Sequence, residues 1–185
     1  MNSYEFTLRF TIADLGADTD ALIEKLYEAG CDDALIGSGQ PGRLALQFTR
    51  EASSAELAMR SAIQNVQSVA PQAMLAEAGP DYVGLSDIAD LLGCSRQYMR
   101  KLMLSHASHP PVPVHEGSTA IWHLADVLVW LRQTKQREVD PWLLEVAILC
   151  KRLNLARHVN VPFSEADILV GLDARNVQAD ALASR

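Results

Sequence analysis

The sequence predicts an α+β protein made of two small folded units and a helical extension. Three observations indicate this class. Alternating apolar and polar residues, typical of half-buried strands, recur within the first 80 residues. Apolar residues at helical spacing dominate the stretch that follows. The pair Gly79-Pro80 separates the two patterns, and glycine beside proline commonly marks a break between elements.

Four segments of the first unit, residues 1–79, follow the pattern of strands. The clearest is the first, where Phe6, Leu8 and Phe10 alternate with polar residues. A turn cluster over residues 37–42 joins the second and third strands into a hairpin. The four predicted strands are residues 5–10, 33–36, 43–50 and 73–78.

Two helices are expected between these strands. Asp18-Thr19-Asp20 can cap the first, which ends near Gly30 and has Leu22, Ile23, Leu26 and Tyr27 as its apolar face. Ser53 and Glu56 form a capping box that opens the second, which runs to about Val69. Strand, helix, strand, strand, helix, strand is the order of a ferredoxin-like βαββαβ domain. Such a domain can serve dimerisation, protein interaction or ligand sensing, and the acidic balance here argues against RNA.

Residues 85–103 carry the pattern of two short helices joined by a tight turn. A small residue is needed where the helices cross, and Ala89 supplies it. Gly93 tolerates the positive φ of the turn, and Ser95 can cap the second helix. The predicted structural core of this motif is Ile88, Ala89, Leu92, Gly93, Met99 and Leu102.

Packing that core inward turns a cationic edge of the second helix outward. Arg96, Gln97 and Arg100 can make paired hydrogen bonds to guanine and adenine edges, and Lys101 can reach phosphates. An ordinary helical hairpin with a charged outer face remains the alternative from this motif alone.

The next stretch predicts a β-hairpin that runs into a helix. Residues 111–116 form its first strand, Gly117-Ser118 its turn, residues 119–124 its second strand, and residues 125–131 the helix. The run from Leu85 to Leu131 resembles the MerR/AlpA-type winged helix-turn-helix domain of excisionases and small phage-type regulators. The matching places are Val112-Pro113-Val114, Trp122, Asp126 and Trp130-Leu131, over about a quarter of the chain.

This resemblance implies a winged helix-turn-helix domain over residues 81–137 that contacts double-stranded DNA. The expected DNA-binding residues are Ser95, Arg96, Gln97, Tyr98, Arg100, Lys101, His115, Ser118 and Thr119. The wing departs from the family, which usually has arginines there. Fewer phosphate contacts imply weak binding by a single domain. A homodimer on an inverted repeat would compensate.

A further helix is expected after residue 140. Asp140 can cap it, and Pro141 is tolerated at its first position. Its apolar stripe is Trp142, Leu143, Val146, Leu149 and Leu153. The extension spans residues 140–175, with Ser164 and Asp167 as a further cap, and residues 176–185 form a flexible tail.

Charge and composition narrow the class of protein. The net charge is −7, and residues 1–80 carry −6 of it, so the segment with the predicted motif is near neutral. Cys31, Cys94 and Cys150 are isolated and odd in number, which favours reduced thiols in a cytoplasmic protein. No membrane helix or signal peptide is expected.

Enzymatic chemistry is not expected, because no catalytic triad, carboxylate pair or phosphate loop occurs. His106 and His109, with Cys94 or His115, do not have the spacing of a zinc site, so neither a metal nor a cofactor is predicted. Asp32-Asp33 is expected to be solvated surface.

Sequence-specific transcriptional regulation is therefore the predicted function, as a dimeric repressor or autoregulator. One alternative is an antitoxin or adaptor that mainly binds a partner protein, such as a neighbour-encoded toxin, through the N-terminal domain or the C-terminal extension. A second alternative is an excisionase-like architectural DNA-binding protein, although bending DNA usually uses more cationic contacts than this chain offers.

Overall fold

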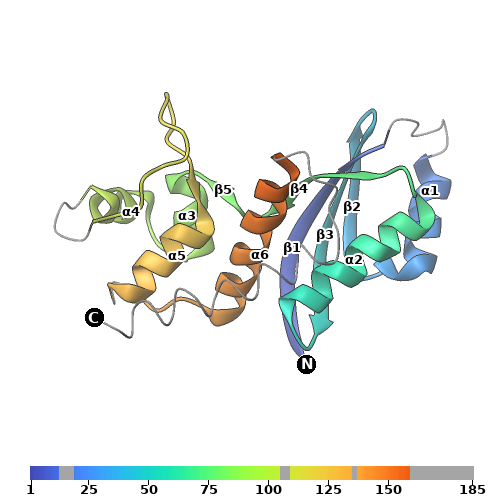
Figure 1. Ribbon diagram of the computed structural model, residues 1–185, viewed down its shortest axis with the longest axis horizontal. Helices are drawn as coiled ribbons and strands as arrows, with labels where there is room; N and C mark the ends of the chain where they lie inside the picture. Colours follow the sequence, from blue (N-terminus) through green and yellow to red (C-terminus); the bar gives the residue numbers. More distant parts are fainter. Residues whose placement is uncertain (13–18, 105–108, 135–136, 159–185) are drawn as a thin grey trace.

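The computed structural model describes residues 1–12, 19–104, 109–134 and 137–158. These residues form a four-stranded antiparallel sheet, a two-stranded pair and six α-helices (Figure 1). The predicted α+β class is confirmed. None of the described helices is both long and apolar enough to span a membrane. The predicted second cap at Ser164 and Asp167 and the tail at 176–185 lie outside the described residues, as does His106.

The four-stranded sheet is built from the first 79 residues. Its strands are β1 (Asn2–Thr11), β2 (Ala34–Gln40), β3 (Arg43–Ala52) and β4 (Met74–Gly79). They lie in the order β2-β3-β1-β4, and every neighbouring pair is antiparallel. At the centre Phe6 lies opposite Phe48, with the ring centroids 5.1 Å apart.

One face of this sheet is covered and the other is open. Alternation along β1 buries Tyr4, Phe6, Leu8 and Phe10 on the covered face. Helices α1 (Thr19–Leu26) and α2 (Ala55–Val69) pack there, and a short π-helical turn (Tyr27–Cys31) follows α1. Polar side chains of β1 and β3 alternate onto the open face.

The hairpin between β2 and β3 is tighter than the sequence predicts. A strand over residues 33–36 with a turn over 37–42 is wrong, because β2 continues to Gln40. Only Pro41 and Gly42 form the connection, and Gly42 has a φ of 73°. A two-residue hairpin needs such a conformation, which glycine adopts without steric cost.

Three side chains near the helices also differ from expectation. Ser54, not Ser53, caps α2, since its hydroxyl accepts from the Leu57 N–H at 3.2 Å. Asp33 is not simply solvated: it binds the Arg50 guanidinium at 2.7 Å. Tyr27, predicted on the apolar face of α1, is 42% exposed at the start of the π-helical turn, in which Gly30 has a φ of 91°.

A second core forms around the predicted helical motif. Its elements are β5 (Tyr82–Val83), α3 (Leu85–Leu91), α4 (Arg96–Met103), β6 (Trp122–His123) and α5 (Leu124–Gln133). Ile88, Ala89 and Met99 are buried in this core, and Leu92 and Leu102 are half-buried beside it.

The wing contains less strand than expected. The first strand over residues 111–116 is wrong, and one isolated bridge, His115 to Ile121, holds the loop. Pro111 and Pro113 have no N–H to donate, which prevents a continuous ladder. The second strand is shorter than predicted, and β6 pairs with β5 rather than with the wing.

Helix α6 (Pro141–His158) lies between the two cores (Figure 1). Asp140 caps it by accepting from the Trp142 N–H at 2.8 Å. Val146, Leu149, Cys150 and Leu153 enter the sheet core, whereas Leu144 and Ala147 enter the second core. The predicted single stripe is therefore wrong: α6 is apolar on two sides, and Trp142 is 42% exposed.

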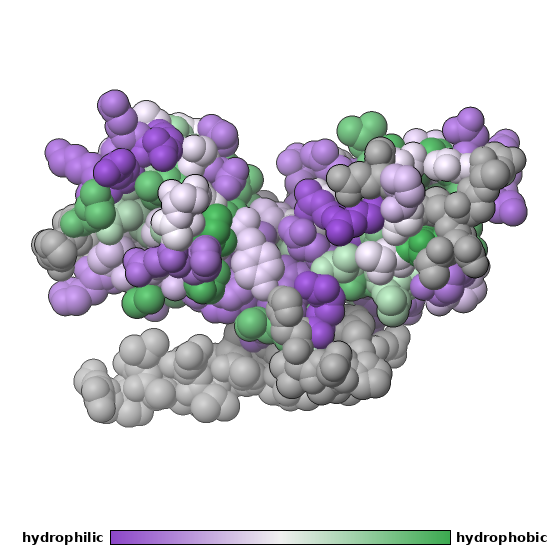
Figure 2. All heavy atoms as spheres, turned by 90° about the horizontal axis from the view of Figure 1, so that it is seen from above, coloured by the Kyte–Doolittle hydropathy of each residue, from purple (hydrophilic) through white to green (hydrophobic). Residues whose placement is uncertain are grey.

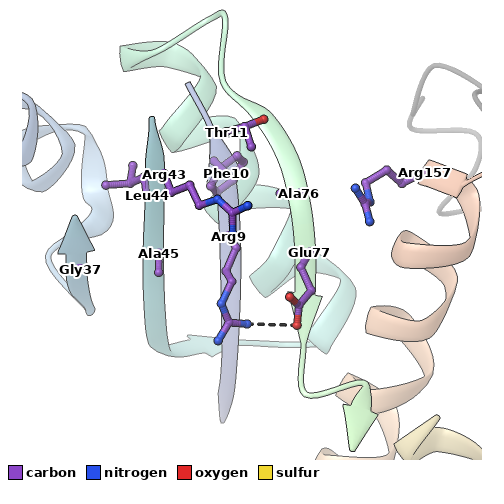
Figure 3. Close-up of a pocket in the computed structure, with 10 residues that line it drawn as sticks. All are labelled: Arg9, Phe10, Thr11, Gly37, Arg43, Leu44, Ala45, Ala76, Glu77 and Arg157. Carbon is purple, nitrogen blue, oxygen red and sulfur yellow. Dashed lines mark hydrogen bonds and ion pairs between the residues drawn. The ribbon is translucent and has the colours of Figure 1, made fainter. Parts of the chain in front are cut away.

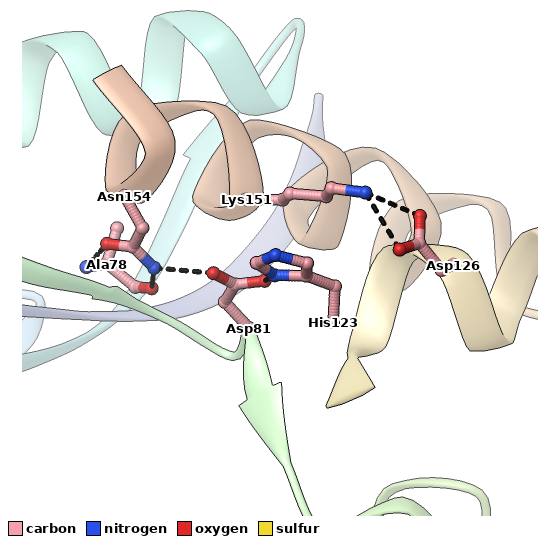
Figure 4. Close-up of polar contacts among 6 residues, drawn as sticks. All are labelled: Ala78, Asp81, His123, Asp126, Lys151 and Asn154. Carbon is pink, nitrogen blue, oxygen red and sulfur yellow. Dashed lines mark hydrogen bonds and ion pairs between the residues drawn. The ribbon is translucent and has the colours of Figure 1, made fainter. Parts of the chain in front are cut away.

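A buried polar network ties α6 to the chain between the two units (Figure 4). The Asp81 carboxylate lies 2.7 Å from His123 Nδ1 and accepts from Asn154 Nδ2 at 2.7 Å. The side-chain amide of Asn154 also exchanges two 2.8 Å hydrogen bonds with the backbone of Ala78, at the edge of β4. Each of these groups is buried and satisfied, so the network fixes how the units meet.

The three cysteines are free thiols with different access to solvent. Burial raises the pKa of Cys31 and raises that of Cys150 strongly, whereas Cys94 is only half-buried. Since the thiolate is the reactive form, we expect an aromatic disulfide reagent to label one thiol promptly at neutral pH and three after denaturation. Cys94→Ser should abolish the prompt phase. Prompt labelling of all three thiols would contradict this packing.

Candidate nucleic-acid interface

Helix α4 presents the cationic edge that the sequence predicts. Ser95 caps it, since its hydroxyl accepts from the Tyr98 N–H at 3.1 Å. Met99 and Met103 are buried, which fixes the opposite side of the helix toward solvent. Five predicted contact residues are exposed on α4: Arg96, Gln97, Tyr98, Arg100 and Lys101. The helix carries three basic residues and no acidic one.

The corner between α3 and α4 is held by backbone hydrogen bonds. Gly93 has a φ of 61°, the left-handed conformation that the sequence predicts. Its N–H donates to Asp90 O at 3.1 Å, and the Cys94 N–H donates to Ala89 O at 2.9 Å. Arg137, which the sequence did not single out, donates to the carbonyl of Leu92. It thereby ties the segment after α5 to this corner.

The left-handed conformation at Gly93 predicts a measurable cost of substitution. No atom lies within 4 Å of a Cβ placed there, so strain would come from the backbone alone. Gly93→Ala should lower the free energy of unfolding by about 1 kcal/mol, and Gly93→Asn by less. Urea unfolding measures both. Gly37→Ala, at an open strand position without positive φ, is the control and should not destabilise.

The exposed helix and the wing share one hollow of about 300 Å³. Arg96 and Arg100 line it from α4, and Ser118 and Thr119 line it from the wing. Ser86, in the first turn of α3, also lines it and was missed in the sequence, where it looks like an ordinary surface serine. The hollow therefore combines two guanidinium groups with three hydroxyls, a set suited to phosphates and base edges.

Other predicted contact residues lie around this hollow rather than in it. Gln97, Tyr98 and Lys101 are exposed on α4 but do not line it. His115 is exposed, and its ring folds over Gly117, where an added Cβ would lie 2.8 Å from Nε2. Trp122 anchors the wing, since its indole N–H donates to Pro111 O at 3.1 Å.

Seen from above, the end of the molecule that carries α4 and the wing shows hydrophilic side chains interspersed with a few apolar ones, as does the rest of this face (Figure 2). Within the described ranges, no group of three histidine, cysteine, aspartate or glutamate side chains is placed to hold a metal ion.

No protein-family model matches the chain, and comparisons with curated proteins and with solved structures gave no match either.

Proposed function

We propose that this protein is a sequence-specific DNA-binding regulator in which α3 and α4 act as a helix-turn-helix and the loop before β6 acts as its wing. The observation that carries the proposal is the shared hollow, where Arg96 and Arg100 of an exposed, acid-free helix meet the hydroxyls of Ser118 and Thr119. Asp87, the acidic residue in that lining, is engaged in capping α3, since its carboxylate accepts from the Gly84 N–H at 2.7 Å.

The dimensions of α4 suit the major groove. Its eight residues span about 12 Å, close to the width of that groove. Arg96, Gln97 and Arg100 lie in its first two turns, the part of a recognition helix that contacts bases. The wing hydroxyls would then contact the phosphates alongside.

The first unit is proposed to have the ferredoxin-like arrangement and to support dimerisation. Its strands lie in the order β2-β3-β1-β4 with helices on one face, which is consistent with a split βαβ domain. A second copy is needed because one domain offers few cations toward phosphate. Two copies related by a twofold axis would bind an inverted repeat.

Fluorescence anisotropy with the duplex upstream of the protein's own coding region tests the proposal. We expect saturable binding of two chains per duplex that weakens as salt increases, since counterions are released on binding. A shuffled duplex of the same composition is the control and should bind more weakly. Equal affinity for both duplexes, or no binding at low salt, would contradict the proposal.

Lys101 gives a prediction about salt dependence. It is exposed on α4 outside the shared hollow, so we assign it to phosphate rather than to bases. Lys101→Gln should weaken binding to the operator duplex and to the shuffled duplex to a similar extent. It should also reduce the slope of log affinity against log salt concentration by about 1 per bound chain. Anisotropy titrations at several salt concentrations measure this slope. A loss confined to the operator would instead place Lys101 on a base.

A further inference from the structure

The open face of the four-stranded sheet carries a hollow that the proposed DNA contacts do not use. It lies where β1, β3 and β4 meet the C-terminal end of α6 (Figure 3). Its volume is about 670 Å³. Arg9, Arg43 and Arg157 line it together with Glu77, and they come from four different elements.

Strand register explains why the surface is hollow at this place. One row across the sheet consists of Gly37, Ala45, Arg9 and Glu77. The two short residues leave space beside the long side chain of Arg9. Arg43 on β3 lies in the next row, and Arg157 reaches toward the sheet from α6 (Figure 3).

The described lining is cationic although the chain as a whole is acidic. Three arginines and one glutamate give an excess of two positive charges, against a net charge of −7 for the chain. Glu77 pairs with Arg9 at 3.1 Å, and both side chains are substantially exposed. Arg43 and Arg157 form no ion pair with any residue in the described part of the chain. Two guanidinium groups thus face the hollow without a described carboxylate of their own.

We propose that this hollow binds a small molecule that carries a diphosphate group. Guanidinium groups match phosphate oxygens with paired, charge-assisted hydrogen bonds. Arg43 lies on β3 and Arg157 approaches from beyond β4, so their backbones are separated by at least two strand spacings, about 10 Å. Two linked phosphates can reach both guanidinium groups at once, each phosphate pairing with one of them.

A single-stranded nucleic acid fits this face less well. Sheets that bind single strands stack bases on aromatic side chains. The residues that alternate with the buried ones on β1 and β3 include no aromatic: they are Ser3, Glu5, Thr7, Arg9, Thr11, Arg43, Ala45, Gln47, Thr49 and Glu51. The acidic residues among them would also repel a phosphate backbone that extends beyond the hollow.

Isothermal titration calorimetry of the full chain with inorganic pyrophosphate tests the site. We expect saturable binding of one pyrophosphate per chain that weakens with added salt. Arg43→Gln and Arg157→Gln should each weaken it about tenfold, because each removes one charge-assisted contact. Glu77→Gln should act in the opposite direction and tighten binding, since it removes the acidic side chain of the described lining.

Two control variants distinguish this site from general charge attraction and from the DNA-binding surface. Arg132→Gln, at an exposed position on α5, should leave the pyrophosphate affinity unchanged. A chain with both Arg96 and Arg100 replaced by alanine should also keep it, so failure of the DNA-binding proposal would not affect this result. The inference is overturned if the unchanged chain gives no saturable heat, if Arg43→Gln and Arg157→Gln both bind normally, or if an oligothymidine displaces pyrophosphate at a far lower concentration than ADP does.

Discussion

Replacing both Arg96 and Arg100 by alanine should reduce the affinity for operator DNA about a hundredfold or more, because each substitution removes an exposed guanidinium group that can pair with a base edge. A bidentate contact of this kind contributes about 1–3 kcal/mol of discrimination. The loss should be larger for the operator than for a shuffled duplex. Anisotropy titrations of both duplexes at one fixed salt concentration measure the difference.

This result can be separated from misfolding. Both arginines are exposed on α4, whereas Met99 and Met103 hold the helix against the core, so the melting temperature should remain near that of the unchanged chain. Arg132→Ala removes an exposed arginine of the same core unit and should affect operator binding far less. If the double variant bound the operator normally, α4 would not be the recognition helix.

The largest expected effect on stability comes from Asp81→Ala. The Asp81 side chain is fully buried and accepts from Asn154 while it pairs with His123. Removing the carboxylate leaves the buried side chains of His123 and Asn154 without this hydrogen-bond partner. Each buried polar group that is left without its hydrogen-bond partner costs about 1–3 kcal/mol. Chemical unfolding followed by circular dichroism should show the transition midpoint at clearly lower denaturant.

Asp126 provides the matched control for that substitution. Its carboxylate also joins two elements, since Lys151 Nζ lies 2.6 Å from Oδ1, but its side chain is 43% exposed. Exposed pairs are screened by solvent and contribute about 1 kcal/mol or less. Asp126→Ala should therefore lower the free energy of unfolding much less than Asp81→Ala. Equal effects would show that burial at the junction is not what stabilises it.

Local chemistry made most elements predictable from the sequence. The alternation around Phe6, the glycine corner at Gly93 and the cap at Ser95 each depend on a few neighbouring residues, and the structure contains all three. The cap of α2 was missed by one position, since Ser53 and Ser54 are equally suitable in sequence. Apolar alternation predicts a strand over residues 111–116, but this pattern takes no account of the N–H groups that Pro111 and Pro113 lack.

Features that depend on distant pairing were not predictable. Asn154 contacts Asp81 across 73 residues of sequence, and nothing near either residue indicates the other. The sequence predicts a single apolar stripe on α6, because one sequence window cannot show that two cores flank the helix. Arg96 and Arg100 could be named as candidates from their helical spacing. Only the tertiary fold brings Ser86 to the hollow and Arg137 to the carbonyl of Leu92.

The position of α6 has a consequence for biosynthesis. Ribosomes release the chain from its N-terminus, so β1 to β4 emerge well before α6, which supplies four side chains to their core. Until Leu149 and Leu153 have left the exit tunnel, the nascent sheet retains an uncovered apolar margin. Fragments that stop before Pro141 should accordingly depend on chaperones, whereas nascent chains that extend past His158 should resist proteolysis.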